Sequence, residues 1–297
     1  MTPPVPAVDD RRPALHRWAW LIVLIGGVAA YLIILRTLVI TQNPLYVPSM
    51  LLLGSAVVPA SVLVYAASGR DRGPVGAATI AAVAGTGGVF GTVAAGTLEY
   101  DTLQRLGAVP MIMVGLIEES AKLVVPIVIL VFAHRLRAIP AAGVVIGIAS
   151  GMGFATLETM GYGFSALLET RSIADLDQTL LLRGLLSPAG HVAWTGITTA
   201  ALWRIPTARR RGWAVLVSVG AFVASVALHA LWDGSDSAVV RAVVGLVSFG
   251  ALLVVVHRSR RPAGPDPSAD AVSASAPAQL RAPVPPAPQG SQPSSTP

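Results

Sequence analysis

The sequence predicts an all-α protein of about eight membrane-spanning helices, and two observations carry that prediction. First, hydrophobic residues make up 54% of the 297 residues, charged residues make up only 12%, and the mean hydropathy is +0.68. Soluble domains carry about 25% charged residues. Second, the apolar residues form runs close to the roughly 20 residues that a helix needs to cross a bilayer. Lipid is therefore the expected surrounding of most of the chain.

Eight apolar runs meet this length, and polar or turn-forming residues separate them. They cover residues 18–40, 46–67, 75–96, 108–132, 140–168, 179–203, 212–232 and 237–257. The first run exceeds the core of a signal peptide, which is about 7 to 15 residues, so we expect it to be retained as an anchor. The predicted organisation is an N-terminal segment 1–17, a transmembrane domain 18–257 and a tail 258–297.

Basic residues gather in alternate loops between these runs. Arginines crowd the N-terminal segment, the loops near 70, 135 and 210, and the residues after 257, whereas the other loops are mostly acidic. This asymmetry predicts a multi-pass protein of the cell membrane with both termini in the cytoplasm. The formal charge of +6 then reflects the orientation of the loops in the membrane. We expect membrane lipid but no nucleic acid as a partner.

Two further features of composition limit the chemistry. The sequence has no cysteine, which excludes disulfides, thiolate catalysis and cysteine-ligated zinc. After Arg261 it is rich in Pro, Ala and Ser, a composition that buries too little apolar surface to fold. We therefore expect a disordered cytoplasmic tail.

Few ionisable residues lie inside the predicted spans, and each costs about 2.5 to 3.5 kcal/mol to insert, so each needs a reason. They are Glu118, Glu119 and Lys122 in the fourth run, Glu158 in the fifth, His191 in the sixth, and His229 in the seventh with Asp233 one turn later. Arginines near the outer helix ends are instead expected to extend toward water: Arg36, Arg183 and Arg241.

Helical spacing predicts where these side chains face. Glu118, Glu119 and Lys122 share one stripe, so the lysine can pair with either glutamate. Glu158 continues a stripe of small residues that lets helices approach closely: Gly143, Gly147 and Gly151. It should face protein.

Depth gives a second argument for convergence. Glu118, Glu158 and His191 each lie ten to twelve residues from an outer helix end, which is roughly 15 to 18 Å at the rise of an α-helix. His229 is shallower. Antiparallel helices would bring these side chains toward a common layer.

Structural interpretations of the same residues stand beside this one. The charged residues of the fourth run could form a purely structural ion pair, although the second carboxylate would then stay unpaired. Glu158 could be an interhelical hydrogen-bonding group, His191 a buried core histidine and His229 an interface histidine. Asp233 could end a helix or face water.

Four motifs in this order resemble the PrsW family of intramembrane proteases, which is distantly related to the CAAX-processing proteases. They are Glu-Glu-x-x-Lys at Glu118, Glu119 and Lys122, Phe-x-x-x-Glu at Phe154 and Glu158, and two later helices with one buried histidine each, His191 and His229. The resemblance covers about residues 75–235. Many members continue the second motif with Asn, whereas Thr159 and Met160 follow here.

The resemblance implies hydrolysis of peptide bonds in membrane-anchored proteins, anti-sigma factors among them. It implies that Glu118 or Glu119 is the general base on a water, that Glu158, His191 and His229 position the water or stabilise the oxyanion, and that Lys122, Phe154 and Asp233 support them. The family has been described both as metalloprotease-like and as glutamate-dependent without metal. Two adjacent carboxylates and a lysine favour the metal-free mechanism; zinc held among the same glutamates and histidines is the alternative.

Two other function classes also place carboxylates and histidines in the middle of a membrane. A proton-coupled transporter would show flux without proteolysis. A non-catalytic membrane scaffold would show neither activity and would tolerate loss of Glu119.

Overall fold

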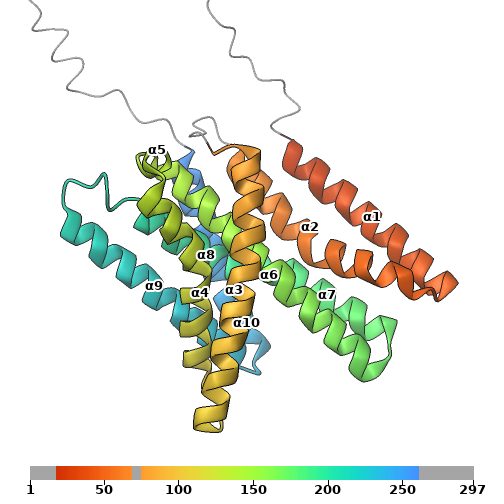
Figure 1. Cartoon of the computed structure of the whole chain (residues 1–297). Helices are drawn as coiled ribbons and strands as arrows, with labels where there is room; N and C mark the ends of the chain where they lie inside the picture. The colour runs from red at the N-terminus through yellow and green to blue at the C-terminus, as the bar shows by residue number, and fades with distance from the viewer. Residues whose placement is uncertain (1–17, 69–74, 261–297) are drawn as a thin grey trace, which may run out of the picture. The chain divides into compact units, whose positions relative to one another are not determined.

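The computed structural model describes residues 18–68 and 75–260, and each regular element in those ranges is helical (Figure 1). The all-α prediction is confirmed. The elements are α1 (Ala19–Thr41), η2 (Pro44–Tyr46), α2 (Val47–Ala67), α3 (Ala77–Leu106), α4 (Met111–Phe132), α5 (His134–Arg137), α6 (Pro140–Thr170), α7 (Ile173–Leu186), η3 (Ser187–Ala189), α8 (His191–Leu202), α9 (Arg211–Gly234) and α10 (Ala238–Ser259). The predicted N-terminal segment and disordered tail lie outside the described residues, apart from the last turn of α10.

Within the described ranges, six helical stretches are long and apolar enough to cross a membrane: α1, η2 with α2, α3, α6, α9 and α10. They coincide with six of the eight predicted runs. A seventh run is α4, which has 22 residues but carries Glu118, Glu119 and Lys122 in its middle. The chain is a polytopic membrane protein of packed helices.

The prediction of one continuous helix over 179–203 is wrong. The helix α7 ends at Leu186, the short η3 turn follows, and α8 begins at His191. Pro188 lies in the turn, and because proline lacks a backbone N–H and clashes with the preceding turn, it interrupts an α-helix. The break places His191 at the start of a helix rather than in the middle of one.

The helix α3 is longer than the predicted span, which ended at 96. It continues to Leu106 and stops at Gly107, whose φ of 70° is the left-handed conformation that glycine adopts at helix ends. Glu99, which follows the predicted end of that span, therefore lies on a helix.

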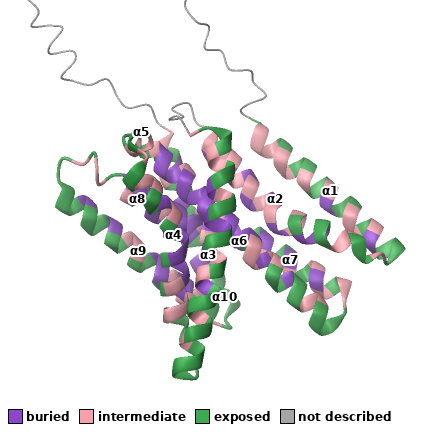
Figure 2. Cartoon of the chain, viewed as in Figure 1, coloured by how far each residue is buried: buried purple, intermediate pink, exposed green. Residues whose placement is uncertain are grey.

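The helix α6 is the most enclosed of the spans. In its most apolar stretch 72% of the residues are buried, compared with 11% in α1. It packs against α2, α3, α4, α7 and α8. Figure 2 shows buried residues gathered along α6 and α8, whereas the surface of α1 is mostly exposed or half-buried. Side chains that face α6 are thus surrounded by protein and do not contact lipid.

Glycines set the close approach of α6 to its neighbours, as the stripe in the sequence predicts. A Cβ atom on Gly143, Gly147 or Gly151 would lie only 2.5 to 2.6 Å from atoms of Trp203, Thr199 or His191. The α8 backbone can therefore lie directly against α6. Across the other side, a Cβ atom on Gly88 would meet the Gly153 backbone at 2.6 Å, so α3 is equally close.

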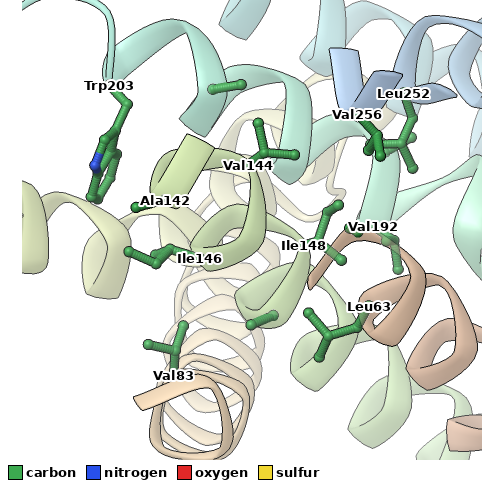
Figure 3. Close-up of a cluster of buried hydrophobic side chains, with 14 residues drawn as sticks. Leu63, Val83, Ala142, Val144, Ile146, Ile148, Val192, Trp203, Leu252 and Val256 are labelled. Carbon is green, nitrogen blue, oxygen red and sulfur yellow. The ribbon is translucent and has the colours of Figure 1, made fainter. Parts of the chain in front are cut away.

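One apolar cluster lies in the half of these helices that is predicted to face the cytoplasm (Figure 3). Ile146 and Ile148 of α6 are at its centre, with Leu63 of α2, Val192 of α8 and Leu252 of α10 around them. Fully burying one such side chain stabilises the fold by about 1.5 to 3 kcal/mol. This cluster holds α6 and α8 in the register that the polar residues require.

A second cluster joins the first two helices to α7. Tyr31 of α1 donates a hydrogen bond of 2.5 Å from its hydroxyl to Asp177 of α7. Leu176 and Leu180 of α7 pack beside Tyr31 and Met50. The helices α1 and α2 therefore support α7, which leads into the broken segment before His191.

Candidate active site

The ionisable residues that the sequence singled out converge at one place, although they come from four helices. Their side chains contact one another, and we call them the polar cluster: Glu118, Glu119 and Lys122 on α4, Glu158 on α6, His191 on α8, and His229 and Asp233 on α9. The predicted common layer is therefore present.

Two glycines make this convergence sterically feasible. A Cβ atom on Gly115 of α4 would lie 2.9 Å from the Val226 carbonyl oxygen and 3.4 Å from Cβ of His229. This contact lets α9 bring His229 against α4. On the other side, a Cβ atom on Gly151 of α6 would lie 2.6 Å from the carbonyl oxygen of His191. Both histidines thus enter the cluster opposite a glycine.

Lys122 forms the centre of the buried charges. Its Nζ donates to Oε1 of Glu119 at 2.6 Å and lies 3.6 Å from Oε2 of Glu118. The lysine is 0% exposed, and the two glutamates are 1% and 6% exposed. Ser150 of α6 donates to the Lys122 carbonyl oxygen at 2.8 Å, which ties α4 to α6 at the same level. The prediction that Lys122 can pair with either glutamate is confirmed, and Glu119 is the closer partner.

His191 has a defined orientation, because each ring nitrogen has a charged neighbour. Its Nδ1 lies 2.8 Å from Nζ of Lys122, and its Nε2 lies 2.9 Å from Oε2 of Glu158. An ammonium group can only donate and a carboxylate can only accept. The contacts therefore assign the lone pair to Nδ1 and the proton to Nε2.

His229 faces two carboxylates. Its Nδ1 lies 2.8 Å from Oε1 of Glu119, and its Nε2 lies 2.9 Å from Oδ2 of Asp233. Trp194 stacks on the ring, with centroids 4.8 Å apart, and donates its own N–H to Ser248 of α10. The ring is thus held from both edges and from one face. Asp233 lies in the last turn of α9, so it both approaches the helix end and contacts the cluster.

Phe154 supports the cluster from α6. Nζ of Lys122 lies 4.6 Å from the centroid of its ring, a cation–π distance, and the ring of His191 lies 5.4 Å away. Phe154 is 2% exposed. It closes the apolar side of the cluster and limits how far the ammonium group can move.

The expectation that Arg183 extends to water is wrong, and sequence reasoning missed a member of the site. Its Nη2 lies 2.9 Å from Oε1 of Glu158, and its guanidinium lies 3.7 Å from the Tyr162 ring centroid. The helix α7 runs beside α6 and brings the arginine back over Glu158. The contact depends on the direction of α7 after the turn at the end of α6, which no local sequence signal indicates.

Two buried carboxylate oxygens have no hydrogen-bond partner within the described protein: Oε2 of Glu118 in the cluster and Oε1 of Glu99 on α3. Glu118 is the most enclosed of these glutamates, and His229 Nε2 lies 3.5 Å from its Oε2. Buried polar groups normally carry a partner. These atoms can therefore take one from water or from a substrate, which is what a hydrolytic site needs.

A family model described as the PrsW family intramembrane metalloprotease matches residues 73–257. This chain belongs to that family. The predicted resemblance is confirmed over a longer stretch than 75–235. No curated protein and no solved structure matches the chain.

Membership in the PrsW family makes this chain an intramembrane protease, and the polar cluster lies wholly inside the matched residues. The match also begins after α2, so the pair α1 and α2 that supports α7 lies outside it. The family description implies a metal, which the described side chains can be tested against.

The donor set fits a divalent metal in part. One ligand atom each from Glu118, His191 and His229 lies within 4.8 Å of the others. Oε2 of Glu118 is 3.5 Å from Nε2 of His229 and 3.8 Å from Nδ1 of His191, near the roughly 3.3 Å that separates ligands on tetrahedral zinc. However, Nδ1 of His191 accepts from Lys122. A metal at these three residues would require the lysine to release it.

Proposed function

We propose that this PrsW-family chain hydrolyses peptide bonds of membrane-anchored proteins, with Glu118 as the general base on the attacking water. The observation that carries the proposal is the environment of Oε2 of Glu118. This oxygen is buried, accepts no hydrogen bond from the residues that the structure describes, and lies 3.5 to 3.8 Å from Lys122, His191 and His229. A water at this oxygen would have the Glu118 carboxylate as an acceptor and the nitrogen atoms of Lys122 and His229 as donors around it.

Glu119 suits a different role. Its Oε1 accepts from Nζ of Lys122 at 2.6 Å and lies 2.8 Å from Nδ1 of His229. A carboxylate engaged in two such contacts is less available to a water. Glu119 therefore acts as a positioning residue that fixes the lysine and orients the His229 ring, which supports Glu118 over Glu119 as the base.

The reaction then follows from the donors and acceptors of the cluster. The water oxygen forms a bond to the scissile carbonyl carbon, and its proton passes to Glu118. The oxyanion is stabilised by the Lys122 charge and by the proton on Nε2 of His229, once that proton leaves its contact with Asp233. When the C–N bond breaks, Glu118 returns the proton to the leaving amine. Glu158 orients His191, which in turn holds Lys122 in place.

A second candidate mechanism is metal-dependent, and the family description together with the three converging donor atoms favours it. Glu118, His191 and His229 would hold the metal, which would polarise the scissile carbonyl and promote ionisation of a water. Glu119 would then orient His229 toward that metal. The hydrogen bond from Lys122 to His191 is what favours the first mechanism, since it occupies the Nδ1 lone pair that a metal would need.

The proposed substrate is a membrane-anchored regulatory protein with a single span, and the proposed location is the cell membrane. The buried position of the cluster among apolar helices supports this choice, because a membrane-embedded segment can approach such a site laterally. An anti-sigma factor is one protein of this kind.

The test is cleavage of candidate single-pass peptides by purified protein in detergent or proteoliposomes, with products identified by mass spectrometry. We expect cleavage by the unmutated chain, and a rate lower by on the order of 10² to 10³ for His191→Ala, which releases Lys122. Exhaustive chelation should leave the rate unchanged if Glu118 acts alone. Loss of activity that zinc restores would instead establish the metal-dependent mechanism, and absence of any cleaved peptide would contradict both.

A further inference from the structure

A cavity of about 340 Å³ opens beside the polar cluster. His191 and Asp233 of the polar cluster are among the residues that line it, so the cavity adjoins the reactive groups. Arg183 of α7, Trp194 of α8, Trp232 of α9 and Arg241 of α10 also line it. The cavity is large enough for one or two amino-acid side chains and has apolar walls.

Two arginines line this cavity, and they differ in what they already bind. Arg183 has Glu158 at 2.9 Å and stacks on Tyr162 at 3.7 Å. Arg241, in the first turn of α10, has Asp236 at 3.9 Å, and that aspartate is fully exposed. An exposed ion pair of this length contributes little energy. Arg241 is therefore the cation whose hydrogen-bonding capacity is least used.

The acidic groups near the cavity do not cancel this charge. Asp233 is the carboxylate in the lining, and it lies 2.9 Å from Nε2 of His229. Glu158 lies against both Arg183 and His191. Each of these carboxylates thus has a cationic or proton-donating neighbour of its own. A negative group that enters the cavity meets Arg241 without displacing an existing strong contact.

The position of the cavity argues for a peptide side chain over a lipid headgroup. His191 contributes to its lining and also belongs to the polar cluster, so a group bound there lies next to the scissile bond. Trp194 and Trp232 provide flat apolar surfaces, which suit the methylene groups of an amino-acid side chain. A lipid phosphate at the same place would obstruct the approach to the base.

We propose that this cavity is a substrate subsite and that Arg241 recognises an aspartate or glutamate side chain close to the cleaved bond. The proposal rests on the proposed peptidase function, and it adds the class of residue that the enzyme selects. Arg241 is a specificity-determining residue. It makes none of the contacts of the polar cluster, so its replacement should alter selection without removing the reaction.

The test uses one single-pass peptide that the protein cleaves, prepared with Glu, Gln or Lys at each position around the cleavage site. For the unmutated protein, kcat/KM should be about five- to tenfold higher with Glu than with Gln at one of these positions. Arg241→Gln should remove the difference, and Arg241→Glu should favour the Lys peptide. Arg105→Glu, an exposed arginine at the end of α3 that does not line the cavity, is the matched control and should preserve the Glu preference.

The outcomes separate this proposal from the function it rests on. Cleavage with equal kcat/KM for Glu, Gln and Lys peptides would overturn the subsite while leaving the peptidase function intact. Binding of the Glu peptide in preference to the Gln peptide, measured by fluorescence anisotropy without any cleavage, would support the subsite and contradict the function. A Glu preference that phosphatidylglycerol micelles abolish, with Arg241→Gln changing only lipid binding, would assign the cavity to lipid and overturn the proposal. The peptide series needs no protein variant, so it remains decisive if an Arg241 variant does not fold.

Discussion

Nζ of Lys122 lies 2.8 Å from Nδ1 of His191, although the two residues are 69 positions apart in the sequence. The same ammonium group lies 2.6 Å from Glu119 and 3.6 Å from Glu118. It therefore occupies the region in which a metal held by Glu118 and the two histidines would carry its positive charge. Lys122 is the single lysine of the sequence, and it supplies the cation that the buried carboxylates require.

Replacing Lys122 with methionine should make the cluster a better metal site. The Lys122→Met side chain has similar length and packs against Phe154, but it leaves Nδ1 of His191 free and the two glutamates without their cation. Zinc affinity, measured by isothermal titration calorimetry, should rise at least about tenfold because a like charge has been removed beside the donor atoms.

The control for this change is Arg105→Met, which removes an exposed positive charge at the end of α3. It should leave zinc affinity as it is. Equal zinc affinity in the Lys122→Met variant and the unmutated protein would mean that the lysine does not compete with metal, and the argument for the metal-free mechanism would lose its basis.

The two adjacent glutamates should respond differently to the same substitution. Glu118→Gln removes the proposed base but no strong contact, so the rate of peptide cleavage should fall by on the order of 10² to 10⁴ with little change in thermal stability. Glu119→Gln breaks the buried pair with Lys122 and should lower the free energy of unfolding by about 3 to 5 kcal/mol. Cleavage assays and thermal unfolding in detergent measure both effects.

Glu169→Gln is the matched control, because Glu169 is exposed near the end of α6. It should change neither rate nor stability. If Glu118→Gln cleaves a verified peptide at the unmutated rate while Glu119→Gln is stable and inactive, the two assignments must be exchanged.

The sequence predicted the positions of most spans and the convergence of Glu118, Glu158, His191 and His229, because long apolar runs and helical spacing carry that information locally. It did not predict the break before His191, since an isolated Pro188 is tolerated inside many membrane helices. It also could not predict that Arg183 pairs with Glu158. That contact depends on the direction of α7 after the chain turns at the end of α6, which is a tertiary property.

The orientation of the chain in the membrane remains a prediction from the distribution of arginines. Reporter fusions in the loops near residues 133–139 and 204–211 should give cytoplasmic signals, and fusions near residues 107–110 and 171–172 should give signals from the opposite side. The loops alternate along α4, α6 and α8, so one consistent orientation must explain all of the fusions. Cytoplasmic signals from the second pair would reverse the predicted topology.

The last prediction concerns Gly147 of α6, and it tests whether close packing of α6 on α8 places His191. A Cβ atom at this position would lie 2.6 Å from Cβ of Thr199 and 2.7 Å from the Thr195 carbonyl oxygen. Neither atom is the end of a flexible side chain, so Gly147→Ala must push α8 away from α6. We expect a loss of about 1 to 3 kcal/mol in stability.

The same substitution should lower peptide cleavage by at least about tenfold, because His191 begins α8 and would move with it, and small displacements of catalytic groups are costly. Gly161→Ala is the matched control on the same helix: a Cβ atom there meets nothing within 4 Å. That variant should be as active as the unmutated protein and, by helix propensity, about 0.5 to 1 kcal/mol more stable. If Gly147→Ala matches Gly161→Ala in both cleavage rate and melting temperature, the glycine contact is not what holds His191 beside Lys122.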